Sequence, residues 1–318
     1  MTHRLVISLI SMLGLAAAAA SGQPKSAAGQ PKIVSERLAE GVWAAPTPGG
    51  ANVGWFTEGD DVIAVDSGAT EPVGRALVAQ IQKTTGKKPR FVVITHAHRD
   101  HAGGVAAFAA AGAGVIAAEK AAPGILALLA ASGEATPGKG ARRPSAKPVV
   151  MTVSERLLFV GETRRTEIYY LGPGHTQGDL VVALPAEEVL FSGDLAVTGV
   201  LPFLRSADVD PANWERILTR LRAVKVEKLV PGHGEIGPPQ GLADTAAYIA
   251  RVNEIAARLV VANAPDGLVE SILAAPENTI ENVKLTPDHI ANVTAVYHFA
   301  KAEHAKSAPR PTTTPQSP

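Results

Sequence analysis

The sequence predicts a layered α/β fold, because short apolar and β-branched runs alternate with segments of helical period. Of the 318 residues, 46% are hydrophobic and 19% are charged, which is enough apolar material for one large core between packed layers. The alternation occurs twice, on either side of a glycine- and proline-rich stretch at residues 133–148 that we expect to be a loop. We therefore expect one main domain at residues 33–239.

The first half of this domain begins with strands joined by tight turns. Glycine and proline clusters such as those at residues 48–50 and 59–61 mark the turns. Apolar residues then recur at a helical period, and Gly86 ends that helix. The expected strands are 41–45, 53–56, 62–66, 91–95 and 114–118, and the expected helices are 72–85, 104–111 and 119–131.

The second half repeats short strands and then changes character. Asp210 and Pro211 form a typical helix start before the apolar period that ends at Leu221. After Pro239 the pattern is helical, which predicts a C-terminal helical segment at 240–305. The expected strands are 149–153, 157–160, 166–171, 180–184, 189–192 and 229–233, and the expected helices are 211–221, 242–262, 268–273 and 287–305.

Both ends of the chain differ in composition from the domain. Residues 1–23 combine basic residues, a short apolar run and small residues, which predicts a signal peptide and an exported protein, periplasmic or secreted. The apolar run is too short to span a bilayer comfortably, and we expect no stable membrane insertion after the signal is cleaved. Residues 24–32 are expected to be a flexible linker, and residues 306–318 a disordered tail.

Charge and cysteine content restrict the partners and the chemistry. Thirty basic residues balance thirty acidic ones, so no overall field would attract nucleic acid, and we expect a small-molecule substrate. The chain has no cysteine, so disulfides and thiolate metal ligands are excluded. Side-chain metal ligands must then come from His, Asp or Glu.

Residues 95–101 carry the strongest chemical signal in the chain. They follow an apolar run that reads as a buried strand, and they hold three of the nine histidines and one aspartate. Imidazole and carboxylate together are a ligand set for zinc. This concentration at one strand end predicts a metal site.

Three later segments place a further His or Asp beside glycine. Glycine next to a ligand lets the backbone turn sharply and approach a metal closely. The remaining histidines lie in the predicted signal peptide or the C-terminal helices. The seven candidate ligands are His96, His98, Asp100, His101, His175, Asp194 and His233. Seven ligands are too many for one tetrahedral ion that also keeps a position open for water, which favours two metal ions.

The motif H-x-H-x-D-H, followed in order by His, Asp and His, resembles the motifs of the metallo-β-lactamase superfamily, and Asp66 after the strand at 62–65 extends the resemblance. The resemblance covers residues 34–237. It implies a four-layer αββα sandwich of the metallo-β-lactamase type, with two sheets packed face to face and helices outside. In this chain the C-terminal helical extension would follow that sandwich.

The resemblance also implies a dinuclear zinc centre, with other divalent metals as alternatives. Asp66 is expected to fix the ligand loop by accepting hydrogen bonds. A hydroxide bridging the two ions would attack a substrate carbonyl, and Asp100 either orients this hydroxide or acts only as a ligand. The implied ligands are His96, His98 and His175 for the first ion, Asp100, His101 and His233 for the second, and Asp194 as the bridge.

The resemblance implies hydrolysis of a carbonyl C–N, C–O or C–S bond in a β-lactam, lactone, ester or thioester. The β-lactamase branch with a cysteine ligand does not fit, because Asp194 stands at that position. A bridging Asp is similar to the ligand set of glyoxalase II-like thioesterases. The alternatives are therefore such a thioesterase, or a diiron oxidoreductase or non-hydrolytic metal-binding protein of the same fold.

A few apolar residues are candidates for a substrate groove. Pro202 and Phe203 follow the expected bridging aspartate, and Trp55 lies in an expected strand of the first half. Trp214 stands at helical spacing with Ile217, which favours a place in the core.

Overall fold

The computed structural model describes residues 31–133, 149–161, 164–280 and 282–307. The expected signal peptide, most of the linker at 24–32, the loop from residue 134 to 148 and the tail beyond residue 307 lie outside the described residues. Within the described ranges, no helix combines the length and apolar character needed to cross a membrane.

The first half of the domain forms a seven-stranded sheet in which the strands follow one another in chain order. The first four strands make an antiparallel meander, whereas the fourth to the seventh run parallel. The strands are β1 (Glu36–Ala39), β2 (Val42–Pro46), β3 (Asn52–Glu58), β4 (Asp61–Val65), β5 (Phe91–Ile94), β6 (Gly114–Ala118) and β7 (Val150–Val153). Between the parallel strands lie α1 (Glu71–Thr85), α2 (Arg99–Ala102), α3 (Val105–Ala110) and α4 (Ala122–Gly133).

The second half forms a five-stranded sheet in the order β12-β11-β10-β9-β8. Its first four strands in sequence are antiparallel, and the last strand pairs parallel with its neighbour after a helical crossover. The elements are β8 (Arg156–Val160), β9 (Arg165–Tyr170), β10 (Leu180–Leu184), β11 (Val189–Thr198), α5 (Pro211–Leu221) and β12 (Lys228–Gly234).

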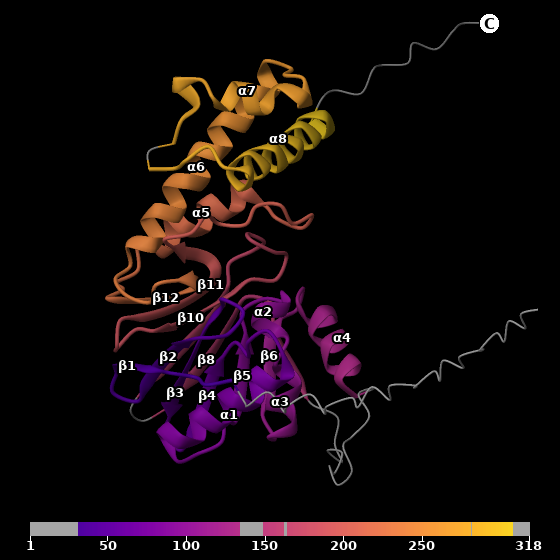
Figure 1. The fold of residues 1–318 in the computed structure, drawn as a ribbon. Coiled ribbons are helices and arrows are strands. Elements are labelled where there is room, and N and C mark those ends of the chain that lie inside the picture. The colour runs from indigo at the N-terminus through magenta and orange to yellow at the C-terminus, as the bar shows by residue number, and fades with distance from the viewer. Residues whose placement is uncertain (1–30, 134–148, 162–163, 281, 308–318) are drawn as a thin grey trace, which may run out of the picture. The chain divides into compact units, whose positions relative to one another are not determined.

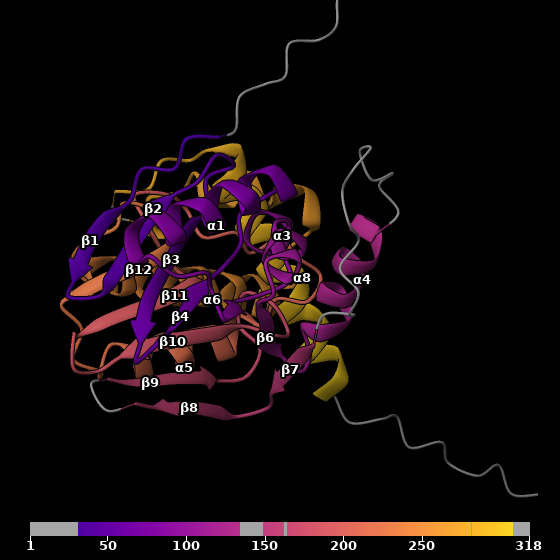
Figure 2. The ribbon, with the colours of Figure 1, turned by 90° about the horizontal axis from the view of Figure 1, so that it is seen from below.

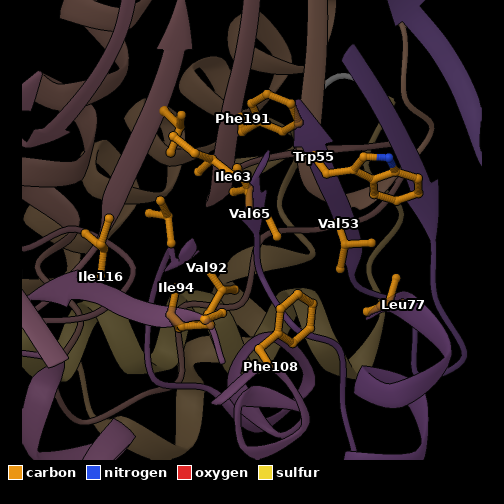
Figure 3. Close-up of a cluster of buried hydrophobic side chains, with 14 of the residues drawn as sticks. Val53, Trp55, Ile63, Val65, Leu77, Val92, Ile94, Phe108, Ile116 and Phe191 are labelled. Carbon is orange, nitrogen blue, oxygen red and sulfur yellow. The ribbon is translucent and has the colours of Figure 1, made fainter. Parts of the chain in front are cut away.

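The two sheets pack face to face through their apolar faces. Phe56 of β3 and Phe191 of β11 meet across the interface with ring centroids 6.2 Å apart. Because side chains alternate along a strand, Trp55 faces the other way, and its Nε1 donates a hydrogen bond to Thr84 of α1. Figure 3 shows Trp55, Phe191 and, from α3, Phe108 among the buried apolar side chains of this region. Both faces of this sheet are thus buried.

The outer face of the five-stranded sheet is covered by helices from the C-terminal half. Trp214 of α5, which was expected in the core, is fully buried in a cluster with Leu190 of β11 and Ile249 of α6. Figure 1 shows α5 and the later helices beyond this sheet, and Figure 2 shows α1 and α3 across the other one. The later helices are α6 (Gln240–Val261), α7 (Val269–Leu273) and α8 (Pro287–Ser307). The four-layer αββα sandwich with C-terminal helices is confirmed.

The local sequence signals act as expected at two helices. Thr70 caps α1 by accepting a hydrogen bond from the Val73 amide, and Gly86 ends the helix at φ 74°. The Asp210 carboxylate accepts from the Asn213 amide at the start of α5. These caps satisfy backbone groups that have no partner inside the helix.

Besides β1, which was not among the expected strands, two elements that carry candidate ligands differ from the sequence expectation. The strand expected at 189–192 continues to Thr198, because β11 keeps pairing with β12 beyond an irregularity after Phe191. The single helical turn α2 was not expected, because four residues are too few to show a period. Both differences fall at candidate metal ligands.

Gly54 should be essential to the packing of the two sheets. A Cβ at this position would lie 2.0 Å from the Phe191 ring, so Gly54→Ala should destabilise the fold by about 1–3 kcal/mol. Urea unfolding measures the change, and Phe191→Leu in the same chain should recover part of it. The control is Gly237→Ala, where a Cβ would meet nothing within 4 Å. Equal stability of the two single variants would contradict this packing.

Candidate metal centre

The His-rich cluster lies where β5 ends and α2 begins. Asp100 and His101 belong to the helical turn, and His98 directly precedes it. The turn is fastened to the loop after β4, because the backbone amide and the hydroxyl of Ser67 both donate to the His101 carbonyl. The neighbouring strand end therefore fixes the position of this ligand loop.

The remaining candidate ligands come from the five-stranded sheet. His175 lies in the loop between β9 and β10, Asp194 lies within β11, and His233 lies near the end of β12. Gly232 confirms the expected role of glycine beside a ligand, since a Cβ there would lie 1.9 Å from Asp194 Oδ1. The structure thus brings the seven residues together from the two sheets.

The first group contains His96, His98, His175 and Asp194, whose ligand atoms lie within 4.8 Å of one another. The distance is 2.9 Å from His175 Nε2 to His98 Nδ1, and 3.3 Å from His175 Nε2 to Asp194 Oδ2. His96 Nε2 lies 3.9 Å from the same carboxylate oxygen. These lengths bracket roughly 3.3 Å, the ligand-to-ligand spacing around a tetrahedral zinc ion with bonds of about 2.0–2.1 Å.

The second group contains Asp100, His101 and His233. His233 Nε2 lies 3.0 Å from Asp100 Oδ2 and 3.4 Å from His101 Nε2. The other oxygen of Asp194, Oδ1, lies 3.0 Å from His101 Nε2 and 3.4 Å from His233 Nε2. The two carboxylate oxygens of Asp194 are therefore divided between the two groups.

Backbone carbonyls fix the tautomers of two histidines. Nδ1 of His175 lies 3.2 Å from the Phe203 carbonyl oxygen, and Nδ1 of His233 lies 3.1 Å from the Gly50 carbonyl oxygen. A carbonyl can only accept, so each Nδ1 carries the hydrogen. Nε2, which faces the other ligands, is left with a lone pair for a metal when the ring is neutral.

Asp66 orients one histidine of each group, as its position predicted. Its carboxylate lies 2.8 Å from His101 Nδ1 and accepts hydrogen bonds from the amide and the hydroxyl of Thr95. Because the Thr95 hydroxyl donates to Asp66, it is free to accept from His96 Nδ1 at 3.1 Å. Asp66 itself has φ 64°, a left-handed backbone that Asp tolerates better than most residues.

The donor set fits zinc. His96 Nε2 is buried and has no hydrogen-bond partner among the described residues. A buried polar atom without a partner is costly, and a metal ion would satisfy it. Neutral imidazole and carboxylate are also the ligands that zinc takes in the absence of thiolate.

Charge differs between the two groups. Burial lowers the pKa of His96 well below its usual value and lowers that of His175 to about 4, so both rings are neutral. Burial acts against protonation at His101 too, but the carboxylates of Asp194 and Asp66 outweigh it and raise the pKa of His101 well above its usual value. Hydrogen bonds to Asp100 and Asp194 raise the pKa of His233 to about 10.

Asp179 supports the His175 loop and was not identified from the sequence. Its buried carboxylate accepts hydrogen bonds from the amides of Gly174 and Thr176 and from the Thr176 hydroxyl. Burial raises the pKa of Asp179 to about 7, although these hydrogen bonds act in the opposite direction. The sequence signal was an aspartate that closes a glycine-rich turn.

The two groups open into a cavity of about 450 Å³. Phe203, a predicted groove residue, lines it and is 44% exposed. Pro202 is buried and lines a neighbouring cavity instead. Trp55 was wrongly placed in the groove, because its face of β3 turns towards α1 and its side chain is fully buried. The other cavity residues are Arg99, Val197, Val200, Leu201 and five of the candidate ligands.

Comparison with known families gives a match over this region. The model of the "Metallo-beta-lactamase superfamily" matches residues 46–233, which include every candidate ligand. A curated relative from Bacillus sp. (strain 170), "Metallo-beta-lactamase type 2", is 30% identical over 181 residues, which are 55% of this chain and 63% of the relative. The chain therefore spans less than two thirds of the length of that relative.

Solved structures agree on the fold. The metallo-beta-lactamase FIM-1 from Pseudomonas aeruginosa, in a mono-zinc form, has a TM-score of 0.55 and 25% identity, covering 69% of this chain and 96% of that one. A metallo-beta-lactamase from Pontibacter korlensis has a TM-score of 0.55 and 24% identity, covering 69% and 99%.

Asp66→Asn should weaken metal binding. Asp66 Oδ1 accepts from the Thr95 amide, and Oδ2 accepts from both the Thr95 hydroxyl and His101 Nδ1. The NH₂ group of Asn can accept at neither position, so the substitution disturbs the support of a histidine in each group. Loss of such a partner costs about 10- to 100-fold in metal affinity. Competition with a chelator measures this change, and Asp60→Asn, at an exposed carboxylate, is the control. Unchanged affinity in Asp66→Asn would remove Asp66 from the support of the site.

Zinc binding should release more protons from the second group than from the first. His233, with a pKa of about 10, and His101 hold protons near pH 7.5 that a metal must displace, whereas His96 and His175 are already neutral. The zinc affinity of the second group should therefore fall about tenfold for each unit by which the pH is lowered, for each proton that the metal displaces. Calorimetry in buffers of different ionisation enthalpy counts these protons, and His233→Ala should release about one fewer. Equal release on binding each of the two ions would contradict this assignment.

Proposed function

Because this chain belongs to the metallo-beta-lactamase superfamily, we propose that it is a dinuclear zinc hydrolase that cleaves a carbonyl C–N, C–O or C–S bond in a small molecule. The division of the Asp194 carboxylate between two ligand groups carries this proposal, since one oxygen lies 3.3 Å from His175 Nε2 and the other 3.0 Å from His101 Nε2. Two zinc ions held there would supply a hydroxide nucleophile at neutral pH and stabilise negative charge on the substrate oxygen.

The protein residues hold the reacting groups and shape the space around them. Six ligands are divided equally between the two groups, and Asp194 supplies the negative charge shared by both. Asp100 is half-buried at the cavity, where its carboxylate can accept a hydrogen bond from the attacking group. Val200 and Phe203 form an apolar wall against which the non-reacting part of a substrate can pack.

β-Lactams are the first substrate class to test, because the curated relatives bear the name metallo-beta-lactamase. The cavity also supports an anionic substrate. Arg99 is exposed and lines the cavity beside the ligands, and a guanidinium pairs well with the carboxylate that β-lactams carry next to the scissile amide.

Esters, lactones and thioesters are the second class. The observation in their favour is Asp194 at the position that joins the groups, in a chain without cysteine. This carboxylate resembles the bridging ligand of glyoxalase II-like thioesterases.

We also propose that the protein is exported, on the basis of residues 1–23, whose order of basic, apolar and small residues is typical of a cleaved signal. Fractionation of cells that express the full chain, with sequencing of the mature N-terminus, tests this. A cytoplasmic protein with an intact N-terminus would refute export and leave the hydrolase proposal unaffected.

The purified protein should bind two zinc ions and hydrolyse at least one member of a panel of β-lactams, lactones, thioesters and phosphoesters. Asp194→Ala should lower kcat/KM on the best substrate by at least about 100-fold, because it removes a ligand from both groups. Metal content and initial rates are the measurements, with the exposed Asp60→Ala as control. Trace metal in the wild-type protein, or full activity of Asp194→Ala, would overturn the dinuclear mechanism.

A further inference from the structure

A buried polar side chain of α8 forms hydrogen bonds to the loop at residues 202–204, which contacts His175 of the first ligand group. Asn292 is 1% exposed, and its side chain makes two hydrogen bonds to this loop. Its Nδ2 donates to the Pro202 carbonyl at 2.8 Å, and its Oδ1 accepts from the Leu204 amide at 3.2 Å. One side-chain amide therefore holds the backbone on both sides of Phe203, at Pro202 and at Leu204.

The peptide that joins Phe203 to Leu204 extends this contact to the metal centre. Its N–H end donates to Asn292, and its carbonyl end accepts from His175 Nδ1 at 3.2 Å. The described chain contains no cis peptide bond, so this unit is planar and trans, and its N–H and C=O point in opposite directions. Fixing the N–H towards Asn292 thereby fixes the C=O towards His175.

The orientation of Asn292 is itself determined by its partners. The Pro202 carbonyl can only accept and the Leu204 amide can only donate, so only one placement of the Asn292 oxygen and nitrogen satisfies both. Nδ2 also donates to the Tyr248 hydroxyl of α6 at 3.0 Å, and that hydroxyl lies 3.0 Å from His289 Nδ1. Burial lowers the pKa of His289, so its neutral ring can accept from Tyr248.

We propose that Asn292 is a positioning residue for the first metal ion, acting on His175 through the Phe203–Leu204 peptide. The inference rests on the proposed zinc function. It assigns to α8 a part in a metal centre whose candidate ligands all lie within residues 46–233, the range matched by the family model. The C-terminal helices then do more than cover the five-stranded sheet, because they set the tautomer and direction of a ligand.

The first test needs no metal. In the metal-free protein with ¹⁵N-labelled histidine, long-range ¹H–¹⁵N spectra report which nitrogen of His175 carries the proton. The wild type should show the Nδ1–H tautomer, and Asn292→Ala should shift His175 towards a mixture of tautomers. Asn278→Ala is the matched control. Asn278 is also a buried asparagine of the C-terminal helical segment, between α7 and α8, but its Nδ2 donates to the Ile272 carbonyl instead.

The second test is a double-mutant cycle on metal affinity. It is measured by cobalt titration in a His233→Ala background, which weakens the second group only. Asn292→Ala should weaken binding about tenfold when His175 is present, and less than about twofold when His175 is replaced by Ala. A general loss of structure would give the same factor in both cases.

The outcomes separate this inference from the proposed function. Additive effects in the cycle, or an unchanged His175 tautomer in Asn292→Ala, would overturn the role of Asn292 even if the enzyme is active. If the wild type binds no metal, the hydrolase proposal fails and the tautomer measurement still decides whether Asn292 orients His175. Should Asn292→Ala not fold, Asn292→Ser keeps a buried hydroxyl beside Tyr248 on a side chain one bond shorter, and the same comparisons apply.

Discussion

The arrangement of this centre depends on a hydrogen-bond constraint on imidazole rings. A histidine binds a metal only through a nitrogen without a proton, so the proton must be held on the other nitrogen. The fold supplies acceptors for His175 and His233 from backbone carbonyls, whereas Asp66 serves His101 directly and His96 through Thr95. A buried carboxylate that bonds both groups links their geometry, and this is a physical reason for a left-handed aspartate at the end of β4.

These acceptors reach the rings because the two sheets pack face to face and bring their ligand-bearing segments together. The cluster at the end of β5 belongs to one sheet, and Asp194 belongs to β11 of the other. Three residues before Asp194, the Phe191 ring fills the space left by Gly54 between the sheets. Interiors are packed as tightly as crystals, so a change in sheet spacing is transmitted as a displacement of ligands. The apolar packing between the sheets therefore helps to determine the positions of the metal ligands.

Side-chain chemistry could be predicted from the sequence, but backbone chemistry could not. The seven ligands stand out because histidines and aspartates beside glycine are conspicuous, and Asp66 follows a clear apolar strand. The carbonyls of Gly50 and Phe203 carry no such signal, because every residue has a carbonyl. Trp55 was misplaced because both faces of β3 are buried, so alternation could not say which face met the site. Asn292 lies on the buried face of α8 between His289 and Val296, and only its tertiary partners reveal its role.

In the proposed hydrolase the ligands would activate water in the same way for many substrates, so selectivity would come from the residues that line the cavity. The apolar wall of the metal cavity includes Val197, Val200 and Leu201, and these three residues also line a second cavity of about 750 Å³ on the α6 side. The loop that carries Val200 and Leu201 continues into Pro202 and Leu204, which Asn292 holds. The two Asn292 hydrogen bonds therefore tie this loop, which lines both cavities, to α8. Asn292 lies beyond the region matched by the family model, so the wall of this cavity depends on hydrogen bonds from outside that region.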